Sequence, residues 1–133
     1  MARQKKVIDA PIAVKWFLEE PDSEKARVVR EDHINRKVLL VAPDLIFTEV
    51  LNALRYKQNK ESALHEANNS LHDIQLHIER INSYLLEKAI ILALQHELSL
   101  YDALYAAVAQ IHGCALVTND EKLRKLPLAE PLS

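Results

Sequence analysis

The chain of 133 residues is 49% hydrophobic and 27% charged, and its formal net charge is −2. This composition is typical of a globular protein, and it excludes both a disordered chain and a nucleic-acid binder that relies on overall positive charge. No apolar run reaches the roughly 18–20 residues of a membrane span or the length of a signal peptide core. The one cysteine, Cys114, cannot form an internal disulfide, so we expect a cytoplasmic protein.

The predicted elements alternate between strands and helices along the chain. In order, we expect strand 6–9, helix 13–18, helix 23–35, strand 38–42, helix 44–59, helix 61–73, strand 75–81, helix 83–96, helix 99–112, strand 115–118 and a helical turn at 119–125. The continuous apolar run 38–42 is typical of a parallel strand covered on both faces. Gly113, the only glycine, is expected to end the helix before it. The alternation predicts one domain over residues 1–133, with a parallel sheet flanked by helices.

Four acids fall where such a fold binds ligands, at the carboxyl ends of the strands. Asp9 ends the first strand, and Asp120 follows the strand that ends at Thr118. Glu49 lies about a turn and a half into the helix after the second strand, and Asp102 lies in the first turn of its helix. Their equivalent places in successive strand–helix units predict a shared acidic site.

Each acid also has an ordinary structural interpretation. Asp9 and Asp120 are both suitable caps for the helices that follow them. Glu49 is placed where an exposed helix residue would be. Ser99 and Asp102 form a good capping box, although the helix that they open is so apolar that it must be buried. An unpaired carboxylate at the start of a buried helix is costly. Each structural interpretation is reasonable alone, but four acids at equivalent strand ends together favour a site.

Carboxylates packed together repel one another and take up protons unless a cation lies between them. Hard oxygen ligands select Mg²⁺ or Mn²⁺, and Mg²⁺ completes its shell with water and substrate phosphate. The acids therefore predict metal-dependent hydrolysis of a phosphodiester, with the metal attracting a polyanion to an acidic protein.

Four segments, taken in order, resemble the motifs of PIN-domain proteins of the VapC type. They are Val7-Ile8-Asp9-Ala10 with 13–18, Ala42-Pro43-Asp44-Leu45 with 49–54, Leu98-Ser99-Leu100-Tyr101-Asp102 with 103–109, and Leu116-Val117-Thr118-Asn119-Asp120 with Leu123. The match covers residues 6–126, nearly the whole chain.

The resemblance implies a three-layer α/β/α sandwich with a mainly parallel central sheet of four to five strands. It also implies a Mg²⁺- or Mn²⁺-dependent endoribonuclease, the toxin of a toxin–antitoxin pair, with a homodimer and a small antitoxin that blocks the site. By motif position the catalytic, metal-binding acids are Asp9, Glu49, Asp102 and Asp120. Asn52 and Thr118 are expected to support the site from beside it.

Other residues are less specific. Lys15 and Arg55 are candidate contacts for RNA phosphates, although for Arg55 an ordinary solvated helix face is at least as good an interpretation. The six histidines show no zinc-protease spacing and no accompanying cysteine cluster, so we expect them to be surface or hydrogen-bonded residues.

One departure from the motifs motivates an alternative function. Pro11 stands where the family commonly has a serine or threonine, two residues after the first acid. The missing hydroxyl and the net negative charge favour an alternative hypothesis, in which the chain is a non-catalytic PIN-like module that binds RNA or a protein partner.

Overall fold

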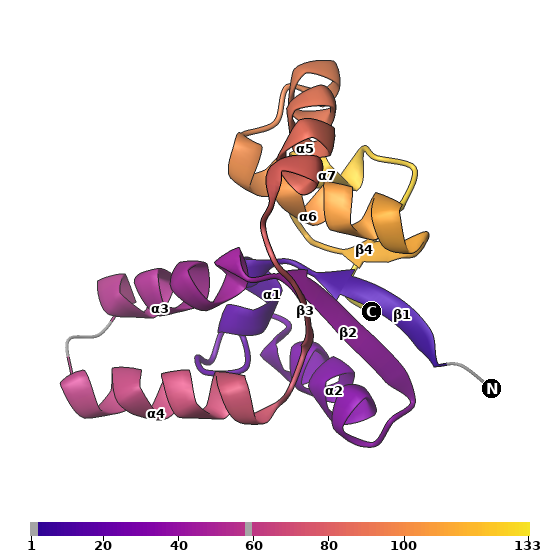
Figure 1. The fold of residues 1–133 in the computed structure, drawn as a ribbon. Helices are drawn as coiled ribbons and strands as arrows, with labels where there is room; N and C mark the ends of the chain where they lie inside the picture. Colours follow the sequence, from indigo (N-terminus) through magenta and orange to yellow (C-terminus); the bar gives the residue numbers. More distant parts are fainter. Residues whose placement is uncertain (1–2, 58–59) are drawn as a thin grey trace.

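The computed structural model describes residues 3–57 and 60–133, and it contains a parallel sheet between two layers of helices (Figure 1). The strands are β1 (Gln4–Ile8), β2 (Val38–Pro43), β3 (His77–Glu79), β4 (Ala115–Val117) and β5 (Ala129–Glu130). They pair in parallel in the order β3-β2-β1-β4-β5. The helices are α1 (Ala10–Val14), α2 (Ser23–Ile34), α3 (Leu45–Lys57), α4 (Glu61–Asp73), α5 (Ser83–His96), α6 (Leu100–His112) and α7 (Glu121–Arg124).

The layers follow from the chain path. Helices α1 to α4 connect β1, β2 and β3 and lie on one side of the sheet, whereas α5 and α6 carry the chain back across the other side to β4 (Figure 1). Helix α6 contacts β1, β2 and β4, and α5 packs on α6. The predicted three-layer fold with a parallel sheet is confirmed. Within the described ranges, no helix combines the length and apolar character needed to cross a bilayer.

Several boundaries differ from the prediction. The helix expected at 13–18 instead begins at Ala10, because the Asp9 side chain accepts a hydrogen bond from the Ile12 N–H and Pro11 fits the first turn. The strand β5 was not predicted, since two residues carry no usable periodicity. The expected end of the third helix at Asn59 lies outside the described residues. Gly113 ends α6 with a φ of 60°, as predicted.

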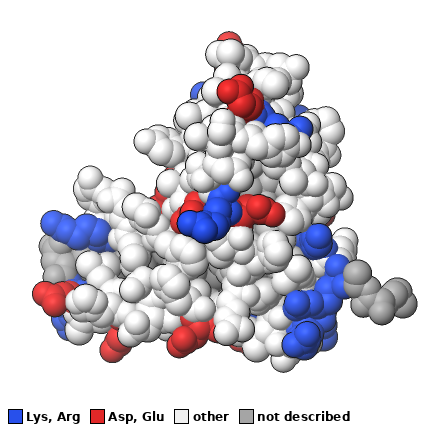
Figure 2. Space-filling model, in the orientation of Figure 1, with Lys and Arg blue, Asp and Glu red and all other residues white. Residues whose placement is uncertain are grey.

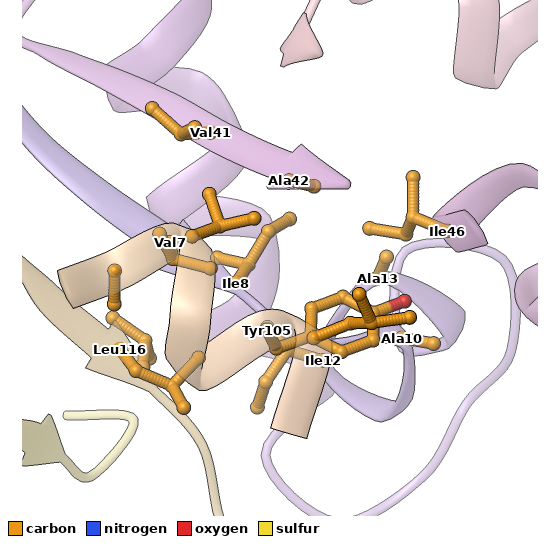
Figure 3. Packing of buried hydrophobic residues seen from close by; sticks show 14 of the residues in the cluster. Val7, Ile8, Ala10, Ile12, Ala13, Val41, Ala42, Ile46, Tyr105 and Leu116 are labelled. Carbon is orange, nitrogen blue, oxygen red and sulfur yellow. The ribbon is translucent and has the colours of Figure 1, made fainter. Parts of the chain in front are cut away.

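The core lies where strand and helix side chains interdigitate on both faces of the sheet (Figure 3). Val7, Ile8 and Val41 from the two central strands are fully buried, as is Ile46 of α3. Tyr105 of α6 is also buried among them, with 2% of its surface exposed. A phenol placed so deeply needs a partner for its hydroxyl, and that partner belongs to the acidic site.

Candidate active site

The strand order creates a crevice at one edge of the sheet. β1 is the middle strand, with β2 on one side and β4 on the other. The connection that leaves β1 leads to β2, whereas the connection that leaves the neighbouring β4 leads the opposite way, to β5. Ligands of open α/β sheets bind at such a switch point. Asp9 directly follows β1, and Thr118 directly follows β4. These two residues therefore meet across the crevice.

The Asp9 carboxylate is held from two sides. Thr118 donates its hydroxyl to Oδ2 at 2.5 Å, and the Ile12 N–H donates to Oδ1 at 3.2 Å. Only 4% of the Asp9 surface is exposed. Burial raises the pKa of Asp9 to about 6, against the opposing effect of these hydrogen bonds, and the nearby Asp102 and Asp120 raise it further. This carboxylate is thus buried, oriented and short of a compensating positive charge.

Thr118 links the first acid to the last. Its hydroxyl oxygen accepts a hydrogen bond from the Asp120 N–H at 3.0 Å while donating to Asp9. Asp120 in turn accepts a hydrogen bond from the Leu123 N–H through Oδ2 at 3.0 Å, as the cap of α7. Thr118 therefore contacts both Asp9 and Asp120, and these two acids both cap helices while facing the same crevice.

Glu49 is held by a residue that sequence reasoning missed. The Tyr105 hydroxyl donates to Glu49 Oε1 at 2.6 Å. Burial raises the pKa of Glu49, the tyrosine hydrogen bond opposes that rise, and Asp102 adds to it. Burial and the neighbouring carboxylate of Glu49 also raise the pKa of Tyr105 well above its ordinary value, so the phenol keeps its proton and remains a donor. The signal in the sequence was a tyrosine one turn after Asp102, within a helix otherwise apolar enough to be buried.

Tyr105→Phe is expected to weaken metal binding about 10–100-fold, the usual effect of removing a group that orients a ligand. The ring and its packing remain, so the fold should persist. Isothermal titration with Mn²⁺ measures the effect. Tyr101→Phe is the matched control, because Tyr101 lies on the same helix with 61% of its surface exposed. Equal Mn²⁺ affinities of the Tyr105→Phe and Tyr101→Phe proteins would contradict this role.

Asp102 takes part in both the helix cap and the site. Its backbone N–H donates to the Ser99 hydroxyl at 3.1 Å, which caps α6. Its carboxylate lines the pocket beside Asp9 and Glu49. Burial raises the pKa of Asp102, Asp120 raises it further, and hydrogen bonding with Ser99 opposes the rise. The capping interpretation and the site interpretation are therefore compatible.

A pocket of about 380 Å³ lies between α1, α3 and α6. Asp9, Glu49 and Asp102 line it, and Asp120 adjoins them through Thr118. Over residues 3–57 and 60–133, no three of these acids bring carboxylate oxygens within 4.8 Å of one another. All four donors are hard carboxylate oxygens, which fits a divalent cation such as Mg²⁺ or Mn²⁺, and the pKa values of Asp9, Glu49 and Asp102 are raised.

Two lysines flank a fourth carboxylate at the pocket, that of Glu20. Lys15 Nζ donates to the Pro21 carbonyl at 2.8 Å and lies 3.6 Å from Glu20 Oε1. Lys57 Nζ lies 3.0 Å from Glu20 Oε2. The hydrogen bond from Lys57 lowers the pKa of Glu20, and Lys15 lowers it further. Lys15 and Lys57 therefore both line the pocket, and contact of Lys15 with RNA stays a prediction.

Asn52 and Arg55 lie elsewhere. Both line a groove between α3 and α4, along with Leu51 and Leu64. The pocket is lined instead by the stripe of Glu49, Ala53 and Lys57, at intervals of four residues. Asn52, three positions after Glu49, lies on the side of Glu49 away from Ala53. Asn52 and Arg55 therefore line this groove rather than the pocket, and the support of Glu49 by Asn52 stays a prediction.

The chain is similar to known proteins over almost its full length. The PIN domain family model matches residues 6–128. Ribonuclease VapC3 of Pyrobaculum aerophilum is 33% identical over 125 residues, which cover 90% of this chain and 92% of that protein. This chain therefore belongs to the PIN domain family.

Solved structures agree on the fold. The Mycobacterium tuberculosis VapC20 structure, described as a sarcin-ricin loop cleaving toxin, superposes with a TM-score of 0.75 at 14% identity over 92% of this chain and 95% of that one. A toxin–antitoxin complex from Klebsiella pneumoniae gives a TM-score of 0.72 at 18% identity, over 94% and 95% of the two chains. At these identities the similarity shows the fold alone.

Proposed function

We propose that this protein is a divalent-metal-dependent endoribonuclease that hydrolyses RNA phosphodiester bonds, and that it is the toxin of a toxin–antitoxin pair. The observation that carries the proposal is Asp9, a buried carboxylate oriented by Thr118 and surrounded by further acids at the switch point of the sheet. Family membership and the similarity to Ribonuclease VapC3 support the choice of RNA and of hydrolysis.

Asp9, Glu49, Asp102 and Asp120 would hold Mg²⁺ or Mn²⁺. The ion would supply activation of water and stabilisation of the charge that develops on the phosphate oxygens. The protein's own groups determine where the acids point. Thr118 and the Ile12 N–H fix Asp9, and the Tyr105 hydroxyl fixes Glu49. Such fixed ligands lower the reorganisation needed at the site.

Contacts to the RNA backbone are proposed to be local. On the face seen in Figure 2, basic side chains lie near the end of α3, near the start of β1, and at the centre, where they adjoin acidic ones. Lys15 and Lys57 lie at the pocket itself, each beside Glu20. Lysines commonly contact the phosphate oxygens of nucleic acids. A phosphate bound at the pocket would therefore compete with Glu20 for the ammonium groups of Lys15 and Lys57.

We also propose an antitoxin partner and a homodimer. The Klebsiella pneumoniae protein with the same fold is part of a toxin–antitoxin complex, which supports the first. The groove between α3 and α4, about 550 Å³ and partly apolar, supports an interface on that face. These assignments rest on similarity and on surface character.

The test of the function is RNA cleavage by the purified protein with Mg²⁺ or Mn²⁺ and with EDTA. Cleavage is expected with either metal and is expected to stop in EDTA. Cleavage that persists in EDTA would contradict the metal-dependent chemistry. RNA binding without turnover in every metal would favour the non-catalytic alternative, which Pro11 motivates because it lines the pocket without a hydroxyl.

A further inference from the structure

Two histidines and a glutamate from distant segments meet outside the acidic pocket. His112 Nε2 lies 2.7 Å from Glu79 Oε1, and His77 Nε2 lies 3.8 Å from the same oxygen. One ligand atom from each of the three residues falls within 4.8 Å of the other two. None of the three lines the pocket of Asp9, Glu49 and Asp102. Their separation in the sequence explains why no histidine spacing predicted this cluster.

The fold determines this convergence. His77 and Glu79 are two residues apart on the edge strand β3, so their side chains project from the same face of the sheet. His112 occupies the last turn of α6, just before Gly113 ends the helix. The rings of His77 and His112 meet edge to face, with centroids 5.4 Å apart. The backbone thus holds two imidazoles around one carboxylate.

We propose that His77, Glu79 and His112 form a second metal site, which takes Zn²⁺ or a similar borderline divalent cation. Two imidazole nitrogens and a carboxylate oxygen are a usual zinc ligand set, with a fourth position left to water. Ligand atoms around tetrahedral zinc lie roughly 3.3 Å apart. The two distances to Glu79, 2.7 Å and 3.8 Å, fall on either side of that value. All three ligand atoms lie within 4.8 Å of one another, so a metal would require them to move closer together.

The exposure of the ligands suits entry of a cation. The side chains of His77 and Glu79 are 45% and 34% exposed, so they can adjust, whereas His112 is 9% exposed and already fixed. The site also lies at the carboxyl end of α6, where the helix dipole favours positive charge. Lys5 opposes binding, because its Nζ lies 3.4 Å from His112 Nδ1, but its exposed side chain is free to turn toward solvent.

The two sites differ in chemistry and are linked by one helix. Imidazole selects zinc-like cations, and carboxylates alone select Mg²⁺ or Mn²⁺. A metal at His112 would tie the edge strand β3 to α6, the helix that also carries Asp102 and Tyr105. This inference does not depend on the proposed ribonuclease activity.

The test is the Zn²⁺-induced change in melting temperature, measured with excess Mg²⁺ present. Each variant is compared with its own zinc-free form, so a general loss of stability does not change the zinc-induced shift in melting temperature. The wild type is expected to gain about 5 °C or more at Zn²⁺ concentrations far above Kd. His77→Ala and His112→Ala are expected to lose most of that gain. Glu79→Gln keeps an acceptor for the His112 hydrogen bond, and it is expected to bind Zn²⁺ at least about tenfold more weakly.

The matched control is His65→Ala, which removes another exposed histidine that is paired with a glutamate, Glu61, at 3.2 Å. It should retain the full zinc-induced gain. An equal gain in the His77→Ala, His112→Ala and His65→Ala proteins would overturn the proposal. So would no gain in the wild type, which would reduce the cluster to a hydrogen bond that fastens α6 to β3.

Discussion

Asp102→Asn is expected to slow RNA cleavage by at least about 100-fold while leaving the metal-free protein as stable as the wild type. Changes in groups that merely orient metal ligands already cost roughly 10–100-fold, so removal of a ligand charge should cost more. Stability should persist because α6 is capped through the Asp102 N–H, which the substitution retains. Single-turnover cleavage and urea unfolding in EDTA measure the two effects.

Ser99→Ala provides the complementary control. It removes the hydroxyl that accepts from the Asp102 N–H, so it should lower the free energy of unfolding by about 1 kcal/mol. Cleavage by the folded Ser99→Ala protein should stay near the wild-type rate. A large loss of metal-free stability in Asp102→Asn, with cleavage retained, would instead show that this carboxylate serves the helix cap alone.

The metal-free protein is expected to lose stability as the pH rises from 4 to 7, and Asp9 should account for roughly 3 kcal/mol of the loss. The pKa of Asp9 is about 6 in the folded protein, against 3.8 for the ordinary carboxyl. Between these values the folded state binds more protons than the unfolded state, so stability falls with rising pH. Below pH 4 both states are protonated and the penalty is absent. The carboxylate is almost fully buried, so solvent screening does not reduce this effect.

Asp9→Asn isolates that contribution. The amide keeps an acceptor for the Ile12 N–H or the Thr118 hydroxyl and cannot ionise, so the variant should be the more stable protein at pH 7 in EDTA. Glu49 and Asp102 also have raised pKa values, so a smaller fall should remain in the variant. The measurement is the free energy of unfolding in urea across this pH range. Parallel pH profiles for the wild type and Asp9→Asn would contradict the assignment.

Much of the fold was predictable because the strands are short, apolar and separated by well-marked helices. The apolar run that begins at Val38 predicted the buried strand β2, and Gly113 predicted the end of α6. The start of α1 was not predicted, because Asp9 was read mainly as a strand end although it is also a helix cap. The strand β5 is too short for any periodicity to indicate it.

The part of the site that could be predicted consists of residues that directly follow the strands, because the sheet order places those residues together. Asp9 and Thr118 follow adjacent parallel strands, and the structure places them in contact. The hydrogen bond from Tyr105 to Glu49 was not predictable, because it depends on how α6 packs against α3. The same reason applies to Asn52, whose side of α3 is decided by packing against α4. The roles of the four acids in metal binding and catalysis stay predictions.

The most direct test of the central claim is the Mn²⁺-induced rise in melting temperature of the wild type and of Asp102→Asn. A metal that binds the folded state alone must stabilise it. Because the pKa values of Asp9, Glu49 and Asp102 are all raised by burial and by neighbouring carboxylates, Mn²⁺ is expected to raise the melting temperature of the wild type by several degrees, about 4 °C or more. Asp102→Asn should lose most of that rise. An equal rise in both proteins, or none in the wild type, would contradict a metal site built on these acids.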